Sequence, residues 1–285
     1  VQHLGDYLLK RTAARRLADG KRQQKRQSEP NDIKNVFLEE RPFESPETVV
    51  LDIGAGDGLL THCLRDYMER KVLGLPLSDN RRNNSRRTNR SKNVDNNRSE
   101  TTVIPTMVAT DDMSWRIFAK AEVEKLSVEQ ALEKYATSST TSSGGDDDGS
   151  LSDPQNDQDR SRPQVIVICS WMPMGEDWTA LFRKAGVDEY ILIGEADDGS
   201  CGDNWLTWGN PHFYDFDAGA IDHDERNADG CHTENDDAFP TPPYEADGYQ
   251  RFDMDAATKY QFSSFDLATS KSSKTVSFRR RTKNP

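Results

Sequence analysis

The residues best suited to chemistry form a glycine-rich turn, Asp52-Ile53-Gly54-Ala55-Gly56-Asp57-Gly58, with the pattern D-x-G-x-G-x-G. Glycine permits a sharp backbone turn and lets a ligand approach the main chain closely. The dinucleotide fingerprint G-x-G-x-x-G requires glycine where this chain has Leu59, and no Walker Gly-Lys-Ser/Thr follows the turn. The two carboxylates of the turn disfavour a pyrophosphate and suit a ligand that carries hydroxyl groups and a positive charge.

Three further segments combine acidic, aromatic and small residues directly after short apolar runs. These segments are Asp111-Asp112, Ser170–Pro173 and Gly194–Gly209. Helix capping is the alternative explanation for the aspartate pair, and a packed loop is the alternative for the last segment. Because ligands bind outside the carboxyl ends of parallel strands, we expect all three segments to join the glycine turn in one site.

Short apolar runs alternate with amphipathic segments, and this alternation predicts an α/β fold with a mostly parallel sheet. Buried strands are predicted over Thr48–Ile53, Thr102–Ala109, Val165–Cys169 and Tyr190–Ile193, and two later strands over Tyr249–Met254 and Thr275–Arg279. Helices are predicted over residues 4–18, 59–68, 121–135 and 178–185.

The chain as a whole is strongly polar, with a net charge of −12 and a mean hydropathy of −0.87. Most of this polarity lies in residues 79–101, 136–162 and 217–238, which we predict to be disordered insertions because they contain too few apolar residues to form a core. We expect residues 1–285 to form a single domain, in which residues 1–47 are an N-terminal helical extension.

The run VVLDIGAGDG resembles the first motif of the class I S-adenosylmethionine-dependent methyltransferases. This resemblance implies a seven-stranded Rossmann-like sheet with helices on both faces and a C-terminal antiparallel hairpin. It also implies S-adenosyl-L-methionine as the cofactor. It further implies that an acid ending the second strand, Asp111 with Asp112 as second choice, holds the ribose hydroxyls. The implied cofactor-binding residues are Asp52, Gly54, Ala55, Gly56, Asp57, Gly58, Asp111, Asp112, Ser170 and Trp171.

The methyl acceptor stays open between a protein, an RNA and a small molecule. N-methyltransferases of the family carry Asp/Asn/Ser-Pro-Pro-aromatic after the fourth strand, whereas this chain has Ser170-Trp171-Met172-Pro173. The aromatic and acidic residues of Gly194–Gly209 suit a cationic or planar acceptor. We expect the acceptor to contact Met172, Pro173, Asn204, Trp205 and Trp208. A general base is needed only if the acceptor carries a proton, and the candidates are Glu195 and Asp177.

Two other classes of function are alternatives for this chain. A non-catalytic protein that keeps the cofactor fold would contact RNA or an acidic partner through the basic segments 81–98 and 279–283. A nicotinamide-dependent oxidoreductase is disfavoured by Leu59, which breaks the dinucleotide fingerprint.

The remaining residue patterns concern membranes, metals and location. No apolar run is long enough to span a membrane. We expect no metal, because His212, His223, Cys231 and His232 lack metal-ligand spacing. The four cysteines form no C-x-x-C and favour reduced thiols in an intracellular protein, cytoplasmic or nuclear. The chain begins at Val1 rather than Met, which leaves organelle targeting open.

Overall fold

The computed structural model describes residues 1–27, 47–76, 103–115, 118–137, 162–196, 200–214, 239–261 and 273–281, with only the backbone for residues 22–27. The predicted insertions 79–101 and 217–238 lie outside these residues, as does 136–162 apart from its ends. The basic segment 81–98 lies outside them as well.

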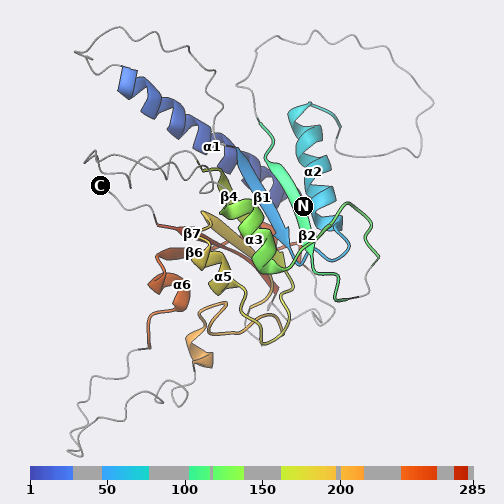
Figure 1. The fold of residues 1–285 in the computed structure, drawn as a ribbon, viewed down its shortest axis with the longest axis vertical. Helices are drawn as coiled ribbons and strands as arrows, with labels where there is room; N and C mark the ends of the chain where they lie inside the picture. Colours follow the sequence, from blue (N-terminus) through green and yellow to red (C-terminus); the bar gives the residue numbers. More distant parts are fainter. Residues whose placement is uncertain are drawn as a thin grey trace, which may run out of the picture.

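Seven strands form one sheet in the order β3-β2-β1-β4-β5-β7-β6 (Figure 1). β7 is antiparallel to both neighbours, and the other pairings are parallel. This confirms the predicted α/β fold and its C-terminal antiparallel hairpin. The strands are β1 (Thr48–Ile53), β2 (Thr106–Asp111), β3 (Glu124–Lys125), β4 (Gln164–Ser170), β5 (Glu189–Glu195), β6 (Tyr249–Asp253) and β7 (Ser273–Arg280).

Helices cover both faces of the sheet, as the buried β1 and β4 require. One face packs against α1 (Gln2–Gln27) and α2 (Leu59–Val72), through a cluster that includes Leu8, Leu64, Val50, Ile168 and Ile191. The other face packs against α3 (Val128–Ala136) and α5 (Thr179–Lys184), through a cluster that includes Leu132, Phe182, Leu51, Val167 and Leu192. The described chain also contains η1 (Pro211–Phe213), α6 (Pro243–Ala246) and α7 (Asp255–Thr258).

The helix predicted over residues 121–135 is wrong in its first half. Residues 124–125 form the edge strand β3, and α3 begins only at Val128. Ser127 caps this helix, because its hydroxyl accepts the Gln130 N–H and the Gln130 side chain accepts the Ser127 N–H. This capping box fixes the start of the helix at Ser127.

Two strand ends also differ from the prediction, and both changes affect the candidate site. β2 begins after Pro105 and continues through Asp111, two residues beyond the predicted end at Ala109, so Asp111 is the last residue of the strand. β5 likewise includes Gly194 and Glu195, because both pair with residues of β7. The antiparallel partner thus extends β5 beyond its apolar run.

A buried carboxylate fixes the N-terminal helix to the sheet. Glu189 of β5 is fully buried and accepts hydrogen bonds from the Tyr7 hydroxyl, from Arg11 Nε at 2.8 Å and from Ser277 Oγ at 2.6 Å. Arg279 Nε lies 3.7 Å from the same carboxylate. Burial, followed by the charge of Glu189, raises the pKa of Tyr7 to about 12. α1 is therefore an integral part of the fold.

Replacing Glu189 by Gln is expected to lower the free energy of unfolding by about 2–4 kcal/mol, because the half-buried Arg11 guanidinium and the Tyr7 and Ser277 hydroxyls lose their ionised acceptor. Urea unfolding followed by tryptophan fluorescence measures this change. The matched control is Glu122→Gln on an exposed residue, which should leave the unfolding midpoint unchanged. Equal stability of the two variants would show that the Glu189 carboxylate does not fix α1.

Candidate functional site

The glycine turn joins the end of β1 to the start of α2 at the carboxyl edge of the sheet. Gly54, Gly56 and Gly58 have φ angles of 68°, 57° and 73°, in the left-handed region that favours glycine. A Cβ on Gly54 would lie 3.0 Å from the Trp178 ring, and one on Gly58 would lie 2.6 Å from Val123. Two of the three glycines are thus also required by packing.

The structure brings Asp111 against this turn. The Gly56 N–H donates to Asp111 Oδ2 at 3.0 Å, and the Ala55 N–H donates to the Thr110 carbonyl at 3.0 Å. The Met113 N–H donates to Asp111 Oδ1 at 2.7 Å. The turn and the end of β2, 55 residues apart in sequence, therefore form one surface around a half-buried carboxylate.

Asp57 and Asp112 make mainly local contacts. Asp57 accepts the Leu59 N–H at 3.0 Å and pairs with Lys120 at 2.9 Å, and the Lys120 hydrogen bond chiefly lowers the pKa of this carboxyl. Asp112 is exposed and accepts the Ser114 N–H at 2.8 Å, which lowers its pKa. Of the two adjacent aspartates at the end of β2, Asp111 alone is bonded to the glycine turn among the described contacts.

Asp52, the first acid of the motif, is buried beneath the turn with 1% of its surface exposed. Its Oδ2 accepts the Thr61 hydroxyl at 2.6 Å, whereas Oδ1 has no hydrogen-bond partner. Burial is the main cause that raises the pKa of Asp52; the Thr61 hydrogen bond opposes the rise, the Asp111 charge adds to it, and the resulting pKa is about 7. The site therefore holds a buried, unpartnered oxygen close to the glycine backbone.

Asp52 makes the stability of the free protein pH-dependent. Its pKa is raised in the folded state, so its stabilising contribution is present below the ordinary value of 3.8 and is lost as the pH rises through about 7. Between about pH 5 and 8 the free energy of unfolding of the wild-type protein should fall by about 2–3 kcal/mol more than that of Asp52→Asn. Denaturant titrations at both pH values measure the difference, with Asp112→Asn as control. An equal change in the free energy of unfolding with pH for wild type and Asp52→Asn would contradict the raised pKa of Asp52.

The end of β4 carries a strained backbone. Trp171 has a φ angle of 60°, rare for a bulky residue, and its side chain is 46% exposed. Its N–H donates to the Ile193 carbonyl of β5 at 2.8 Å, which holds it beside the half-buried Ser170. Met113, just after β2, has the same φ. Strain of this kind gathers at functional sites, so both strand ends favour a ligand site there.

The residues expected to contact the acceptor separate into two groups. Met172 and Trp208 are 3% and 1% exposed and pack in the hydrophobic core, and the Trp208 indole N–H donates to the Cys201 carbonyl at 2.7 Å. Asn204 is also buried, whereas Pro173 and Trp205 are half-buried. We therefore count only Pro173 and Trp205 of this group as surface for an acceptor.

The two candidate bases occupy different surroundings. Asp177 accepts from the Thr179 hydroxyl at 2.5 Å and the Thr207 hydroxyl at 3.1 Å, and lies 3.8 Å from the Arg183 guanidinium. These contacts connect α5 to the loop after β5. Glu195 is fully buried at the end of β5, and neither carboxylate oxygen has a partner.

Two residues of the turn's surroundings were missed at the level of sequence. Trp178 lies in the segment that the sequence predicts as a helix over residues 178–185, and its ring touches the Gly54 position. Thr61 of α2 binds Asp52, nine residues earlier. The only available signal for Thr61 was a polar residue on an otherwise apolar helix face.

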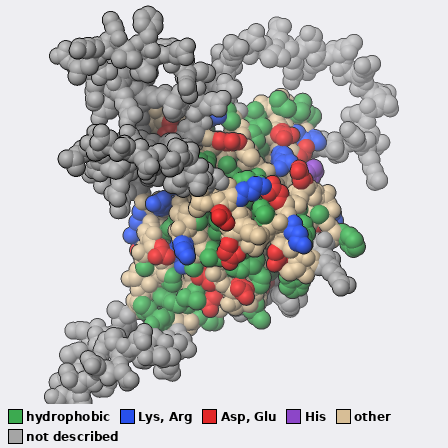
Figure 2. Space-filling view, in the orientation of Figure 1, with side chains coloured by type: hydrophobic (Ala, Val, Ile, Leu, Met, Phe, Trp, Pro, Cys, Tyr) green, Lys and Arg blue, Asp and Glu red, His purple; other side chains and the backbone are tan. Residues whose placement is uncertain are grey.

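Exposed apolar side chains surround this edge of the sheet. Figure 2 shows hydrophobic side chains and carboxylates next to one another on the lower part of the face in view. The exposed apolar residues that follow β4 and β5 are Trp171, Met174, Leu206 and Phe213. Such a border suits an acceptor with planar or positively charged groups.

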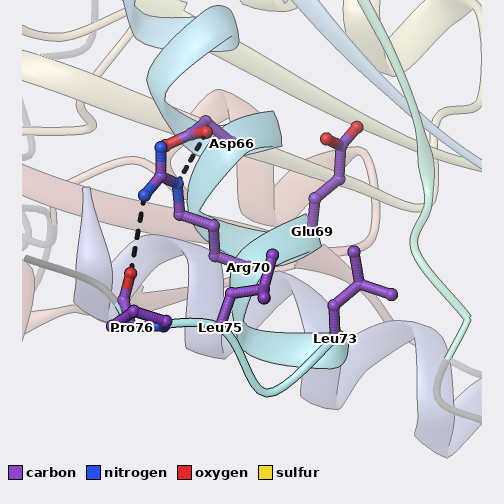
Figure 3. A pocket seen from close by; sticks show the side chains of 6 residues that line it. All are labelled: Asp66, Glu69, Arg70, Leu73, Leu75 and Pro76. Carbon is purple, nitrogen blue, oxygen red and sulfur yellow. Dashed lines mark hydrogen bonds and ion pairs between the residues drawn. The ribbon is translucent and has the colours of Figure 1, made fainter. Parts of the chain in front are cut away.

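A separate cavity of about 340 Å³ lies at the far end of α2, lined by Asp66, Glu69, Arg70, Leu73, Leu75 and Pro76. Figure 3 shows Arg70 turned toward Asp66 and the Pro76 carbonyl. Because it lies at the C-terminal end of α2, this cavity is remote from the glycine turn and contributes nothing to it.

Comparison of the chain with protein families, with curated proteins and with solved structures finds no match. Within the described ranges, no helix has the length and apolar character needed to cross a membrane. The same ranges contain no group of three or more His, Cys, Asp or Glu side chains arranged to hold a metal. The three cysteines of the described chain, Cys63, Cys169 and Cys201, are free thiols.

Proposed function

We propose that this protein is an S-adenosylmethionine-dependent methyltransferase. The observation that carries the proposal is the contact between the glycine turn and the end of β2. There Asp111 accepts the Gly56 N–H of the D-x-G-x-G-x-G turn. The turn follows β1 at the carboxyl edge of the sheet, and the strand order reverses between β1 and β4, which is where open α/β sheets bind ligands. The strand order and the antiparallel β7 support the same resemblance.

The residues present fit this cofactor. The left-handed glycines give a turn whose backbone a ligand can approach closely, and the buried, unpartnered oxygen of Asp52 lies beneath that turn. Asp111, with acceptor capacity left on each oxygen, would accept ribose hydroxyls, and the turn would hold the amino-acid end. The exposed Trp171 and half-buried Ser170 would border the methyl group.

The cofactor supplies a methyl group that its sulfonium already activates. The protein therefore acts mainly by positioning the acceptor nucleophile in line with that methyl and by excluding water. Trp171, held in its strained conformation by the Ile193 carbonyl, would orient the acceptor. Asp177 is occupied by two threonine hydroxyls and Arg183, so its role here is to position α5.

The alternative of a non-catalytic protein that binds through basic segments has less support. Arg279 contacts the Tyr7 hydroxyl at 3.1 Å, Arg280 donates to the Gly186 carbonyl at 3.3 Å, and Arg281 pairs with Glu245 at 2.6 Å. These guanidinium groups serve the fold, while residues 81–98, 282 and 283 lie outside the described chain.

Transfer of a tritiated methyl group into cell lysate tests the proposed activity. We expect label in one of the protein, RNA or metabolite fractions, dependent on the added protein and abolished by Gly56→Arg. Label that is identical with and without the protein would contradict the proposal. Steeply salt-dependent RNA binding without methyl transfer would instead favour the non-catalytic alternative.

A further inference from the structure

Glu195 and Ser273 form a buried polar pair at the carboxyl end of β5. Glu195 is fully buried, and both of its carboxylate oxygens lack hydrogen-bond partners. Ser273, its register partner on β7, is 6% exposed, and its hydroxyl oxygen also lacks a partner. An unpartnered buried carboxylate is costly to the free protein, so the pair points to a ligand that supplies the missing donors.

A third buried acceptor belongs to Gln261, which is bonded to β7 two residues from Ser273. Gln261 donates its side-chain N–H to the Thr275 hydroxyl at 2.5 Å, and its carbonyl oxygen is buried without a partner. Thr275 and Ser273 are two residues apart and so lie on the same face of β7. A carboxylate, a hydroxyl and an amide oxygen thus gather on one face of the sheet.

The chemistry of this cluster favours an organic cation. A primary ammonium has three N–H donors and no acceptor, which matches one carboxylate and two neutral oxygens. Calcium takes six to eight oxygen ligands, usually from several carboxylates, and magnesium requires near-octahedral geometry. With a single carboxylate in the cluster, a metal ion is a poorer match than an ammonium group.

The cluster lies next to the strand end that would border the methyl group. Ser170 of β4 pairs with Ile193, and the Trp171 N–H donates to the Ile193 carbonyl. Glu195 follows two residues later, about 7 Å further along β5. A group bound to Glu195 would therefore lie near an acceptor held against Trp171.

We propose that Glu195, Ser273 and Gln261 bind a primary ammonium group of the methyl acceptor. The identification of that cation as part of the acceptor rests on the proposed function, whereas the cation site itself does not. Glu195 would act as a substrate-binding residue, because its oxygens would hold the charged group of the acceptor.

Titration of the full chain with n-butylamine hydrochloride tests the cation site, with n-butanol as the neutral analogue. We expect butylamine, but not butanol, to bind and to raise the melting temperature. Glu195→Gln should raise the butylamine Kd at least tenfold, because a charge-assisted hydrogen bond is lost. Ser273→Ala should raise it severalfold, and the exposed control Glu122→Gln should leave it unchanged.

Absence of butylamine binding to the wild type, or equal binding to Glu195→Gln, would overturn the proposal. Ser273→Ala, which removes only a hydroxyl, supplies the same comparison if Glu195→Gln does not fold. S-adenosylhomocysteine binding, measured on the same samples, should be equal in wild type and Glu195→Gln. Absence of S-adenosylhomocysteine binding to the wild type would refute the cofactor proposal. The butylamine titration would still show whether the cation site exists.

Discussion

Gly56→Arg is expected to weaken S-adenosylhomocysteine binding by more than about 100-fold, a loss of about 3 kcal/mol. Gly56 has a φ of 57° and lies at the centre of the turn, where its N–H binds Asp111. A side chain there would strain the backbone and occupy the surface that the ligand must approach. Isothermal titration measures the change.

The control for this substitution is Gly74→Arg. Gly74 also has a left-handed φ, 66°, but a Cβ there would meet nothing within 4 Å, and the residue follows the far end of α2. This variant should carry similar backbone strain and bind as the wild type does. Equal binding by both arginine variants and the wild type would remove the glycine turn from the cofactor site.

Asp111→Ala is expected to weaken S-adenosylhomocysteine binding about 10- to 100-fold, because ribose hydroxyls lose an ionised acceptor. The substitution also frees the Gly56 and Met113 N–H groups that now bind this carboxylate. The adjacent Asp112→Ala is a matched control, since this exposed side chain accepts the Ser114 N–H. Isothermal titration measures the Kd of each variant for S-adenosylhomocysteine.

A change of equal size in both aspartate variants would contradict the assignment of the ribose contact to Asp111. The same would follow if Asp112→Ala alone weakened binding. Circular dichroism of each variant identifies any loss of fold, and the melting temperature separates loss of stability from loss of a ligand contact.

The fold followed from local patterns because its strands are buried on both faces. The run TVVLDI has only apolar or β-branched neighbours around one acid, and it became β1 with the predicted bounds. β3 was not predictable in the same way. It consists of two polar residues, Glu124 and Lys125, whose strand conformation depends on pairing with the end of β2. Such pairing is a tertiary effect that periodicity does not report.

The candidate site also contains one part that local sequence patterns predict and another that they do not. The glycine turn was predictable because left-handed backbone needs glycine, and the sequence places three glycines in alternate positions. The burial of Met172 and Trp208 was not, because an apolar residue after a strand suits either a loop core or an exposed border. Only the packing of the loop after β5 against α5 distinguishes these outcomes.

Isothermal titration of the folded, full-length chain with S-adenosylhomocysteine is the most direct test of the cofactor site. We predict saturable binding of one ligand per chain, competition by S-adenosylmethionine and no competition by NAD. Absence of binding to protein with a cooperative melting transition would contradict the proposed cofactor, and competition by NAD would favour an oxidoreductase instead.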